Sequence, residues 1–100
     1  MSLIAWLLPI FRVKVIGPSM EPTLKNGQTC IAVKGNFLAR PGAIAVFVHP
    51  ARPEFVEVKR LINKSSGKWW VAGDNESEST DSRDFGVIEA AVIKGIVIKK

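Results

Sequence analysis

The apolar segments of this chain are short, and glycine, proline or a polar turn ends each of them. No segment has the 3.6-residue period of an amphipathic helix. Residues 11–16, in contrast, read Phe-Arg-Val-Lys-Val-Ile and alternate between apolar and charged side chains. Alternation places successive side chains on opposite faces of a strand. The pattern therefore predicts a protein built from short strands joined by tight turns.

Six segments are predicted to form this sheet: residues 11–16, 28–34, 43–48, 54–63, 68–72 and 87–100. Residues 17–27 contain two prolines and an Asn-Gly pair, so they predict a turn-rich connection with at most one helical turn. Residues 65–67, Ser-Ser-Gly, predict a hairpin turn. With 100 residues, 47% of them hydrophobic, we expect one all-β domain with a curled or barrel-like antiparallel sheet of six to seven strands.

Residues 1–11 are apolar but are too few to cross a bilayer, which needs about 20 apolar residues. They also lack the basic start and small-residue cleavage site of a secretion signal. Two interpretations stay open: a short or truncated membrane anchor, with Trp6 at the interface, or a first element that packs on the core. We expect residues 12–100 to form the functional domain. Its location would be membrane-associated, or cytoplasmic if residues 1–11 do not anchor it.

Charge and composition exclude several classes of function. The net charge is +5, but no run of Lys and Arg exceeds two residues, and no aromatic-basic repeat suggests nucleic-acid binding. The single cysteine, Cys30, cannot form an internal disulfide and is expected to be a buried, inert thiol. One cysteine and one histidine give no metal-ligand cluster, so we expect no metal and no cofactor.

Ser19 is the first candidate for chemistry. It follows a predicted strand in Gly-Pro-Ser-Met-Glu-Pro-Thr-Leu, residues 17–24, where a sharp turn would expose its hydroxyl and its N–H. A nucleophilic serine needs a base. His49 is the only histidine and has no obvious orienting carboxylate, so a Ser-His-Asp triad is disfavoured and we expect His49 in a loop.

Lys59 is the alternative base, because burial among apolar groups lowers the pKa of a lysine and leaves the amine neutral. Strand alternation places Phe55, Glu57 and Leu61 on the face of Lys59, where Phe55 and Leu61 could shield the amine from water. Considered singly, Ser19 would more often be a turn residue and Lys59 a solvated side chain.

A third segment changes this balance. Residues 73–86 read Gly-Asp-Asn-Glu-Ser-Glu-Ser-Thr-Asp-Ser-Arg-Asp-Phe-Gly. The acidic spacing lacks the glycine and terminal glutamate of a calcium loop. Together, the Ser-Met-x-Pro-Thr segment, a Lys-Arg pair on a strand and this Gly-Asp-Asn…Ser-x-Asp-Ser-Arg segment resemble the signal peptidase I family. The resemblance covers about residues 15–86.

The resemblance implies a Ser/Lys-dyad protease, with Ser19 as nucleophile, Lys59 as general base and the Ser19 N–H as oxyanion donor. It implies that Ser79 hydrogen-bonds to the lysine amine and orients it. It also implies that Met20 lines the substrate site. The remaining roles are structural and fall on Asp74, Asn75 and an Asp81–Arg83 ion pair. Gly17 occupies the position where some members have a serine that supplies a second oxyanion donor.

The chain also departs from the larger members of this family. Only a hairpin's length separates Lys59 from Gly73, which leaves no room for their extra β domain. The short branches are more similar: mitochondrial inner-membrane proteases and the proteases that mature nickel-type superoxide dismutase. We therefore expect an endopeptidase that removes a leader or propeptide from a precursor protein, with a nickel-type superoxide dismutase precursor as one candidate.

Two other classes of function stay open. One is a catalytically inactive module that binds extended peptides by strand addition, although retention of both Ser19 and Lys59 argues against it. The other is a LexA-like domain that cuts its own chain. That class lacks the Gly-Asp-Asn…Asp-Ser-Arg segment, and this sequence contains no Ala-Gly or Cys-Gly self-cleavage site.

Overall fold

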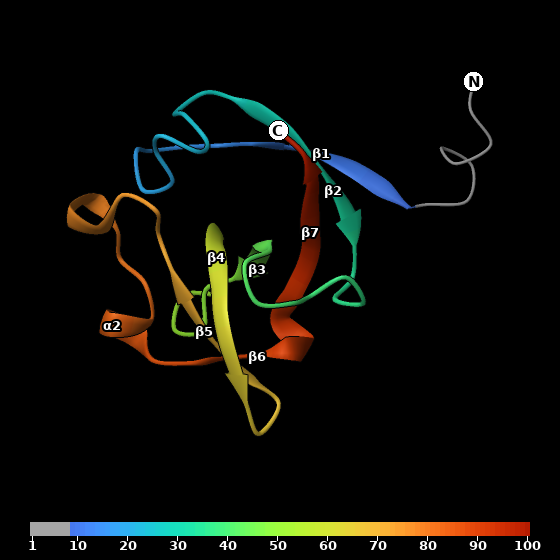
Figure 1. The fold of residues 1–100 in the computed structure, drawn as a ribbon, viewed down its shortest axis with the longest axis vertical. Helices are drawn as coiled ribbons and strands as arrows, with labels where there is room; N and C mark the ends of the chain where they lie inside the picture. Colours follow the sequence, from blue (N-terminus) through green and yellow to red (C-terminus); the bar gives the residue numbers. More distant parts are fainter. Residues whose placement is uncertain (1–8) are drawn as a thin grey trace.

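The computed structural model describes residues 9–100. Seven strands form one antiparallel sheet in the order β1-β2-β7-β3-β4-β5-β6. Their bounds are Ile10–Lys14 (β1), Thr29–Lys34 (β2), Ile44–Val48 (β3), Val56–Ser65 (β4), Lys68–Ala72 (β5), Ile88–Glu89 (β6) and Ile93–Lys99 (β7). The sheet curls strongly around itself (Figure 1), and because β1 and β6 are its two edges it does not close into a barrel. The all-β prediction is confirmed.

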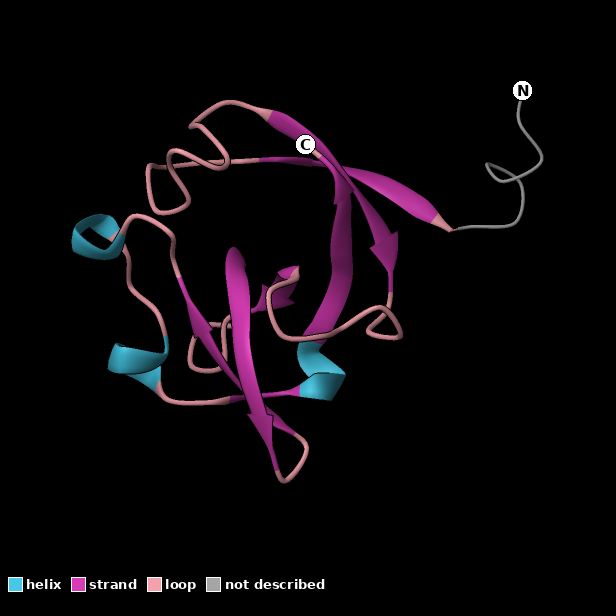
Figure 2. Cartoon of the chain, in the orientation of Figure 1, coloured by secondary structure: helices cyan, strands magenta, loops and turns pink. Residues whose placement is uncertain are grey.

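Among residues 9–100, helical structure is confined to three short pieces (Figure 2). The 3₁₀ helix η1 (Glu76–Glu78) and the four-residue helix α2 (Ser82–Phe85) lie inside the polar segment 73–86. A second 3₁₀ helix, η2 (Ala90–Val92), joins β6 to β7. Residues 17–27 form consecutive turns, with one helix-like bond from the Leu24 N–H to the Met20 carbonyl and a cis Glu21–Pro22 peptide.

The expected single strand over residues 87–100 is wrong. The structure breaks it at η2, so β6 pairs with β5 at one edge of the sheet while β7 lies between β2 and β3. The two pieces therefore belong to different parts of the curled sheet, one at an edge and one in the interior, and the chain needs a bend between them. The bend contains neither glycine nor proline, and residues 87–100 are rich in Val and Ile, which favour strands.

Two buried apolar clusters hold the sheet in this shape. The larger one lies mainly on strands β3, β4, β5 and β7 and contains Ala43, Ala45, Phe47, Leu61, Trp69, Val71, Ile88, Ile93 and Ile96. The smaller one contains Val15, Met20, Leu24, Cys30 and Ile44. Met20 and Leu24 belong to the turns of residues 17–27, so this second cluster packs the Ser19 segment onto the sheet. Cys30 is a buried free thiol, as expected.

The proposed boundary between residues 1–11 and the remaining domain falls within β1, because Ile10 and Phe11 pair with Val33 and Ala32 of β2. Residues 1–8, which include Trp6, lie outside the described residues, so the anchor hypothesis stays a prediction. Within residues 9–100, no helix is both long and apolar enough to span a membrane.

Candidate active site

Ser19 lies in a turn held by contacts from both sides. The Gly17 N–H donates to Asn26 Oδ1 at 2.8 Å, and Gly17 has a φ of 90°, which favours glycine. From the polar segment, the Asn75 N–H donates to the Ser19 carbonyl at 2.9 Å, and Asn75 Nδ2 donates to the Pro18 carbonyl at 3.1 Å. Asn75 thus links the polar segment directly to the Ser19 turn.

Lys59 of β4 meets Ser19 across 40 residues of sequence. Its Nζ lies 2.7 Å from Ser19 Oγ, within hydrogen-bonding distance. Lys59 is only 3% exposed, and burial lowers the pKa of its amine, although the charges of Glu57 and Asp81 act in the opposite direction. No salt bridge among residues 9–100 involves Lys59. The geometry thus combines a hydroxyl with an amine whose burial makes it easier to deprotonate than an ordinary lysine.

The expected apolar shield around Lys59 is only half correct. Leu61 is fully buried in the larger cluster. Phe55, in contrast, is 50% exposed, because it ends the turn before β4, which begins at Val56. In that turn the Phe55 N–H donates to the Arg52 carbonyl.

Asp81 is fully buried and collects hydrogen bonds from three residues. Arg83 donates through Nε and Nη2, both at 2.9 Å, and through its backbone N–H at 3.1 Å; this is the expected ion pair. The Gly73 N–H and Ser79 Oγ donate at 3.0 and 3.1 Å. Burial alone would raise the pKa of Asp81, but these hydrogen bonds outweigh it and hold the pKa well below its usual range.

Ser79 was expected to hydrogen-bond to the Lys59 amine. In the structure its hydroxyl instead donates to Asp81 Oδ2, because hydrogen bonds to an ionised carboxylate are among the strongest that a hydroxyl can make. Ser79 nevertheless packs against the segment that holds Ser19. A Cβ on Gly73 would come within 2.6 Å of both the Ser79 Cβ and the Ser19 carbonyl oxygen.

Arg60 is a site residue that sequence reasoning missed. Its Nε and Nη2 donate to Asp74 Oδ1 and Oδ2 at 2.8 and 2.6 Å, and its Nη1 donates to the Gly42 carbonyl at 2.7 Å. Thr23 also donates to Asp74, from the Ser19 segment. The hydrogen bond from Arg60 is the main reason that the pKa of Asp74 is lowered. The adjacent Lys-Arg pair could have indicated a separate role for Arg60. Neighbouring residues of a strand point to opposite faces, so Arg60 cannot share the face of Lys59.

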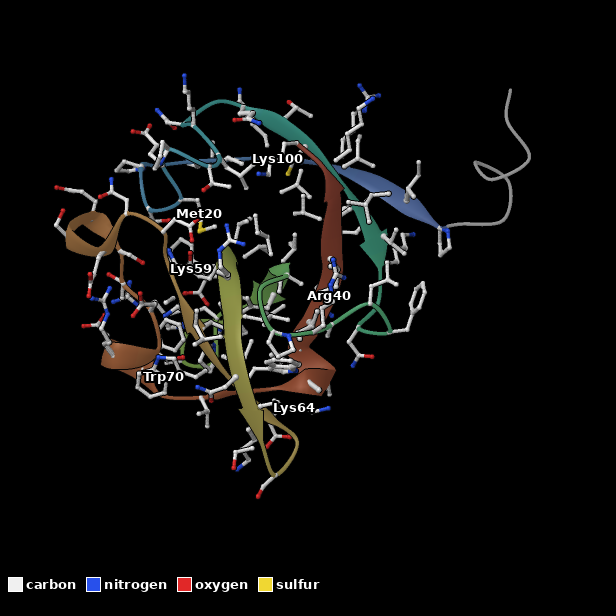
Figure 3. The ribbon with its side chains drawn as sticks, viewed as in Figure 1. Met20, Arg40, Lys59, Lys64, Trp70 and Lys100 are labelled. Carbon is white, nitrogen blue, oxygen red and sulfur yellow. The ribbon has the colours of Figure 1, made fainter. Side chains whose placement is uncertain are left out.

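A narrow cleft of about 130 Å³ opens beside Ser19. Its lining comes from residues 13–16, from Ser19 and Met20, and from residues 56–58. Met20 is almost fully buried there, and its label lies next to that of Lys59 in the view of Figure 3. Residues 56–59 of β4 pair only with β3, because pairing with β5 begins at Arg60. One edge of β4 is therefore unpaired along the cleft.

His49 lies outside this arrangement. It is a loop residue, as expected, but it is buried: its Nδ1 accepts the N–H groups of Ala51 and Arg52 at 3.0 and 3.1 Å, and its ring packs 4.9 Å from that of Phe85. No hydrogen bond joins His49 to Ser19 among residues 9–100. In the same part of the chain, no group of three or more His, Cys, Asp or Glu side chains could hold a metal ion.

Comparison with known proteins shows the family to which the chain belongs. The chain is 30% identical over 115 residues to "Mitochondrial inner membrane protease subunit 1" of Schizosaccharomyces pombe, with 91% of this chain and 73% of that protein covered. The chain belongs to this signal peptidase I-like family. The family members of the same name in Xenopus tropicalis and Mus musculus are 31% and 32% identical. The alignments cover 79% and 84% of this chain but only 61% and 64% of those proteins. No protein-family model matches the chain.

Proposed function

We propose that this chain is a serine endopeptidase of the signal peptidase type that removes an N-terminal leader or propeptide from a precursor protein. The observation that carries the proposal is the 2.7 Å approach of Lys59 Nζ to Ser19 Oγ, with the amine buried. A neutral lysine at this distance can accept the serine proton, as in other Ser-Lys enzymes. The relatives' names, which describe membrane proteases, support the same class of activity.

In the acylation step, Ser19 Oγ attacks the carbonyl carbon of the scissile bond while Lys59 Nζ takes the hydroxyl proton. The tetrahedral intermediate carries its negative charge on the former carbonyl oxygen. Its collapse breaks the C–N bond, and the Lys59 ammonium returns the proton to the leaving amine. The leader then remains as an ester on Ser19, and the mature protein departs with a free amino group.

Deacylation repeats this chemistry with water. Lys59 takes a proton from a water molecule, the hydroxide attacks the ester carbon, and the proton returns to Ser19 Oγ as the leader leaves. The oxyanion requires hydrogen-bond donors in both steps. The Ser19 N–H suits this role, since it donates to no acceptor among the described residues. Gly17 offers no side-chain donor, and its N–H is engaged by Asn26.

The substrate is proposed to bind as an extended strand in the cleft. The Val15 N–H and carbonyl bond to Gln28 and Gly27, so by alternation the main-chain groups of Ile16 face away from β2. Ile16 and the free edge of β4 both line the cleft. A strand between them would point every second side chain into the lining formed by Met20, Val56 and Val58. The small volume favours small side chains at the residue before the cut and two residues earlier.

Ser79, Asp74, Asn75, Asp81 and Arg83 are proposed to position the dyad and not to react. Membrane association through residues 1–11 fits relatives that are named inner membrane proteases. A nickel-type superoxide dismutase precursor is proposed as a candidate substrate, because the short connection between Lys59 and Gly73 resembles that of the proteases that mature it.

The proposal is tested by incubating the protein, with detergent or vesicles, with a fluorogenic peptide that carries alanine at both small positions. Ser19→Ala and Lys59→Ala should each abolish cleavage, because the two residues act as one unit. Circular dichroism should show an unchanged fold. Lys94→Ala, at an exposed lysine of β7, is the matched control and should retain cleavage. Near-wild-type turnover by Lys59→Ala would remove the dyad assignment, and binding without cleavage by the wild type would favour an inactive peptide-binding module.

A further inference from the structure

A second, larger cavity of about 540 Å³ lies on the other side of Glu57. Its lining includes Phe55 and Glu57 from the start of β4, and Asp84 and Phe85 from helix α2. Glu57 lines both this cavity and the cleft beside Ser19. The cavity therefore adjoins the proposed substrate site at Glu57, yet neither the dyad nor the small-residue pockets use it.

The free edge of β4 determines which substrate side chain would reach this cavity. Neighbouring residues of paired strands point their side chains to the same face. Because Lys59 meets Ser19, the scissile bond lies at the Lys59 end of this edge. A bound strand would then place the residue before the cut beside Val58 and the third residue before the cut beside Val56. The second residue before the cut lies beside Glu57 and points to the opposite face.

The charge of the cavity indicates what that side chain is. Glu57 is half-buried, and its carboxylate has no hydrogen-bond or salt-bridge partner among residues 9–100. Asp84 adds a second carboxylate, one oxygen of which accepts the Asp81 N–H. Arg52, which is exposed, contributes the only cationic side chain of the lining, and the His49 ring has its Nδ1 occupied as an acceptor. Two carboxylates against one guanidinium leave the cavity acidic.

We propose that this cavity is a subsite for the second residue before the cut, and that it selects a cationic side chain with Glu57 as the counter-charge. This inference rests on the proposed function. The rings of Phe55 and Phe85 would cover the aliphatic stem of an arginine or lysine, as apolar surface commonly does. The occupant is the substrate's own side chain. Glu57 thereby becomes a residue that determines specificity, distinct from the reacting pair.

The test uses three peptides that differ only at the second residue before the cut, which is arginine, alanine or glutamate. We expect kcat/KM for the arginine peptide to exceed that for the alanine peptide by roughly twofold to fivefold at low salt, the range of a partly exposed ion pair, with glutamate the poorest. Glu57→Gln should reduce the arginine-to-alanine ratio to about one. Glu54→Gln, which removes an exposed carboxylate of the same segment that does not line the cavity, should leave the ratio unchanged.

The ratio separates this effect from any change in the reactivity of Lys59, because such a change alters kcat/KM by the same factor for all three peptides. Equal cleavage of the arginine and alanine peptides by the wild type would overturn the subsite and leave the proposed function standing. If no peptide is cleaved, the proposed function is wrong. Binding of the same peptides to Ser19→Ala, measured by calorimetry, then decides the subsite by the same preference, and equal affinities overturn it.

Discussion

Arg60 and Asp74 form a two-pronged ion pair, with Nε on one carboxylate oxygen at 2.8 Å and Nη2 on the other at 2.6 Å. Arg60 follows the proposed base directly, and Asp74 precedes Asn75, which donates to the Ser19 carbonyl. The pair therefore joins the strand that carries Lys59 to the segment that holds the proposed nucleophile. Positioning of Ser19 against Lys59 depends on this connection as well as on the two reacting groups.

Replacing Arg60 with lysine tests this connection. Lysine retains the charge but cannot donate in parallel to both oxygens of Asp74. We expect Arg60→Lys to lower the free energy of unfolding by about 1–3 kcal/mol, the range for hydrogen bonds to charged groups. We also expect kcat/KM to fall roughly tenfold or more through kcat. Urea titration and steady-state kinetics measure the two effects. Arg12→Lys, at an exposed arginine of β1, is the control and should change neither quantity.

The strands of this fold could largely be predicted from the sequence, because their signals are local. Strand β5 is found at residues 68–72 as predicted, since the Ser66–Gly67 turn bounds one end and polar residues bound the other. The break at η2 could not be predicted from the local sequence. It arises because β6 pairs with β5, whereas β7 pairs with β2 and β3 in another part of the sheet. Burial on two different parts of the sheet determines the bend.

The site divides in the same way. Alternation predicted that Leu61 shares the buried face of Lys59, which needs only the strand period. No local pattern brings Ser19 to Lys59 across 40 residues, or Arg60 to Asp74 across 14. The resemblance to a family supplied the first pair but not the second. The hydroxyl of Ser79 was assigned to the wrong partner, because its orientation depends on the buried carboxylate of Asp81.

Gly73→Ala should damage the site more than the fold. The new Cβ would approach Ser79 Oγ and the Ser19 carbonyl oxygen to 2.6 Å or less, so the segment must move away from the Ser19 turn. We expect kcat to fall at least tenfold and stability to fall by about 1–3 kcal/mol from overpacking. Gly67→Ala is the contrast. Its Cβ meets nothing within 4 Å, but its φ of 78° costs about 1–2 kcal/mol and leaves kcat unchanged. Similar kcat values for the two variants would refute the clash argument.

Ser79→Ala should reduce turnover by roughly 10- to 100-fold while KM stays close to the wild-type value, because Ser79 contacts Asp81 and not the substrate cleft. A residue that positions the base should also shift the alkaline limb of the pH–rate profile, whereas a purely structural residue would lower the whole profile evenly. Ser77→Ala, at an exposed serine of η1, is the control. An even loss at every pH would contradict the positioning role.

Asp81→Asn should reveal an acid-sensitive part of the stability. The native pKa of Asp81 is lowered, so its ionised form stabilises the fold above the unfolded pKa of about 3.9. That contribution is lost as the pH falls below about 4 and through the native value. We expect Asp81→Asn to cost about 2–3 kcal/mol at pH 7, and the difference from the wild type to shrink as the pH falls below 4. Urea titrations across this range measure it, and a constant difference would contradict the assignment. Glu78→Gln, at an exposed carboxylate, should show no such trend.

The burial of Lys59 should lower the stability of the fold at neutral pH, while cleavage depends on the same residue. Burial lowers the native pKa of its amine below the unfolded value of 10.5. The charged amine therefore favours the unfolded state at neutral pH, and stability increases as the pH rises through the window between the two values. Lys59→Met removes this cost and nearly preserves the volume, so it should raise the free energy of unfolding at pH 7 while it abolishes cleavage. The gain in stability should shrink as the pH approaches 10.5.

In the wild type, kcat/KM should increase with pH through one limb below 10.5, because only the neutral amine accepts the Ser19 proton. Lys94→Met, at an exposed lysine of β7, is the control and should change neither property. A loss of stability in Lys59→Met at pH 7 would show that the native site favours the charged lysine and that the proposed base is not poised to react.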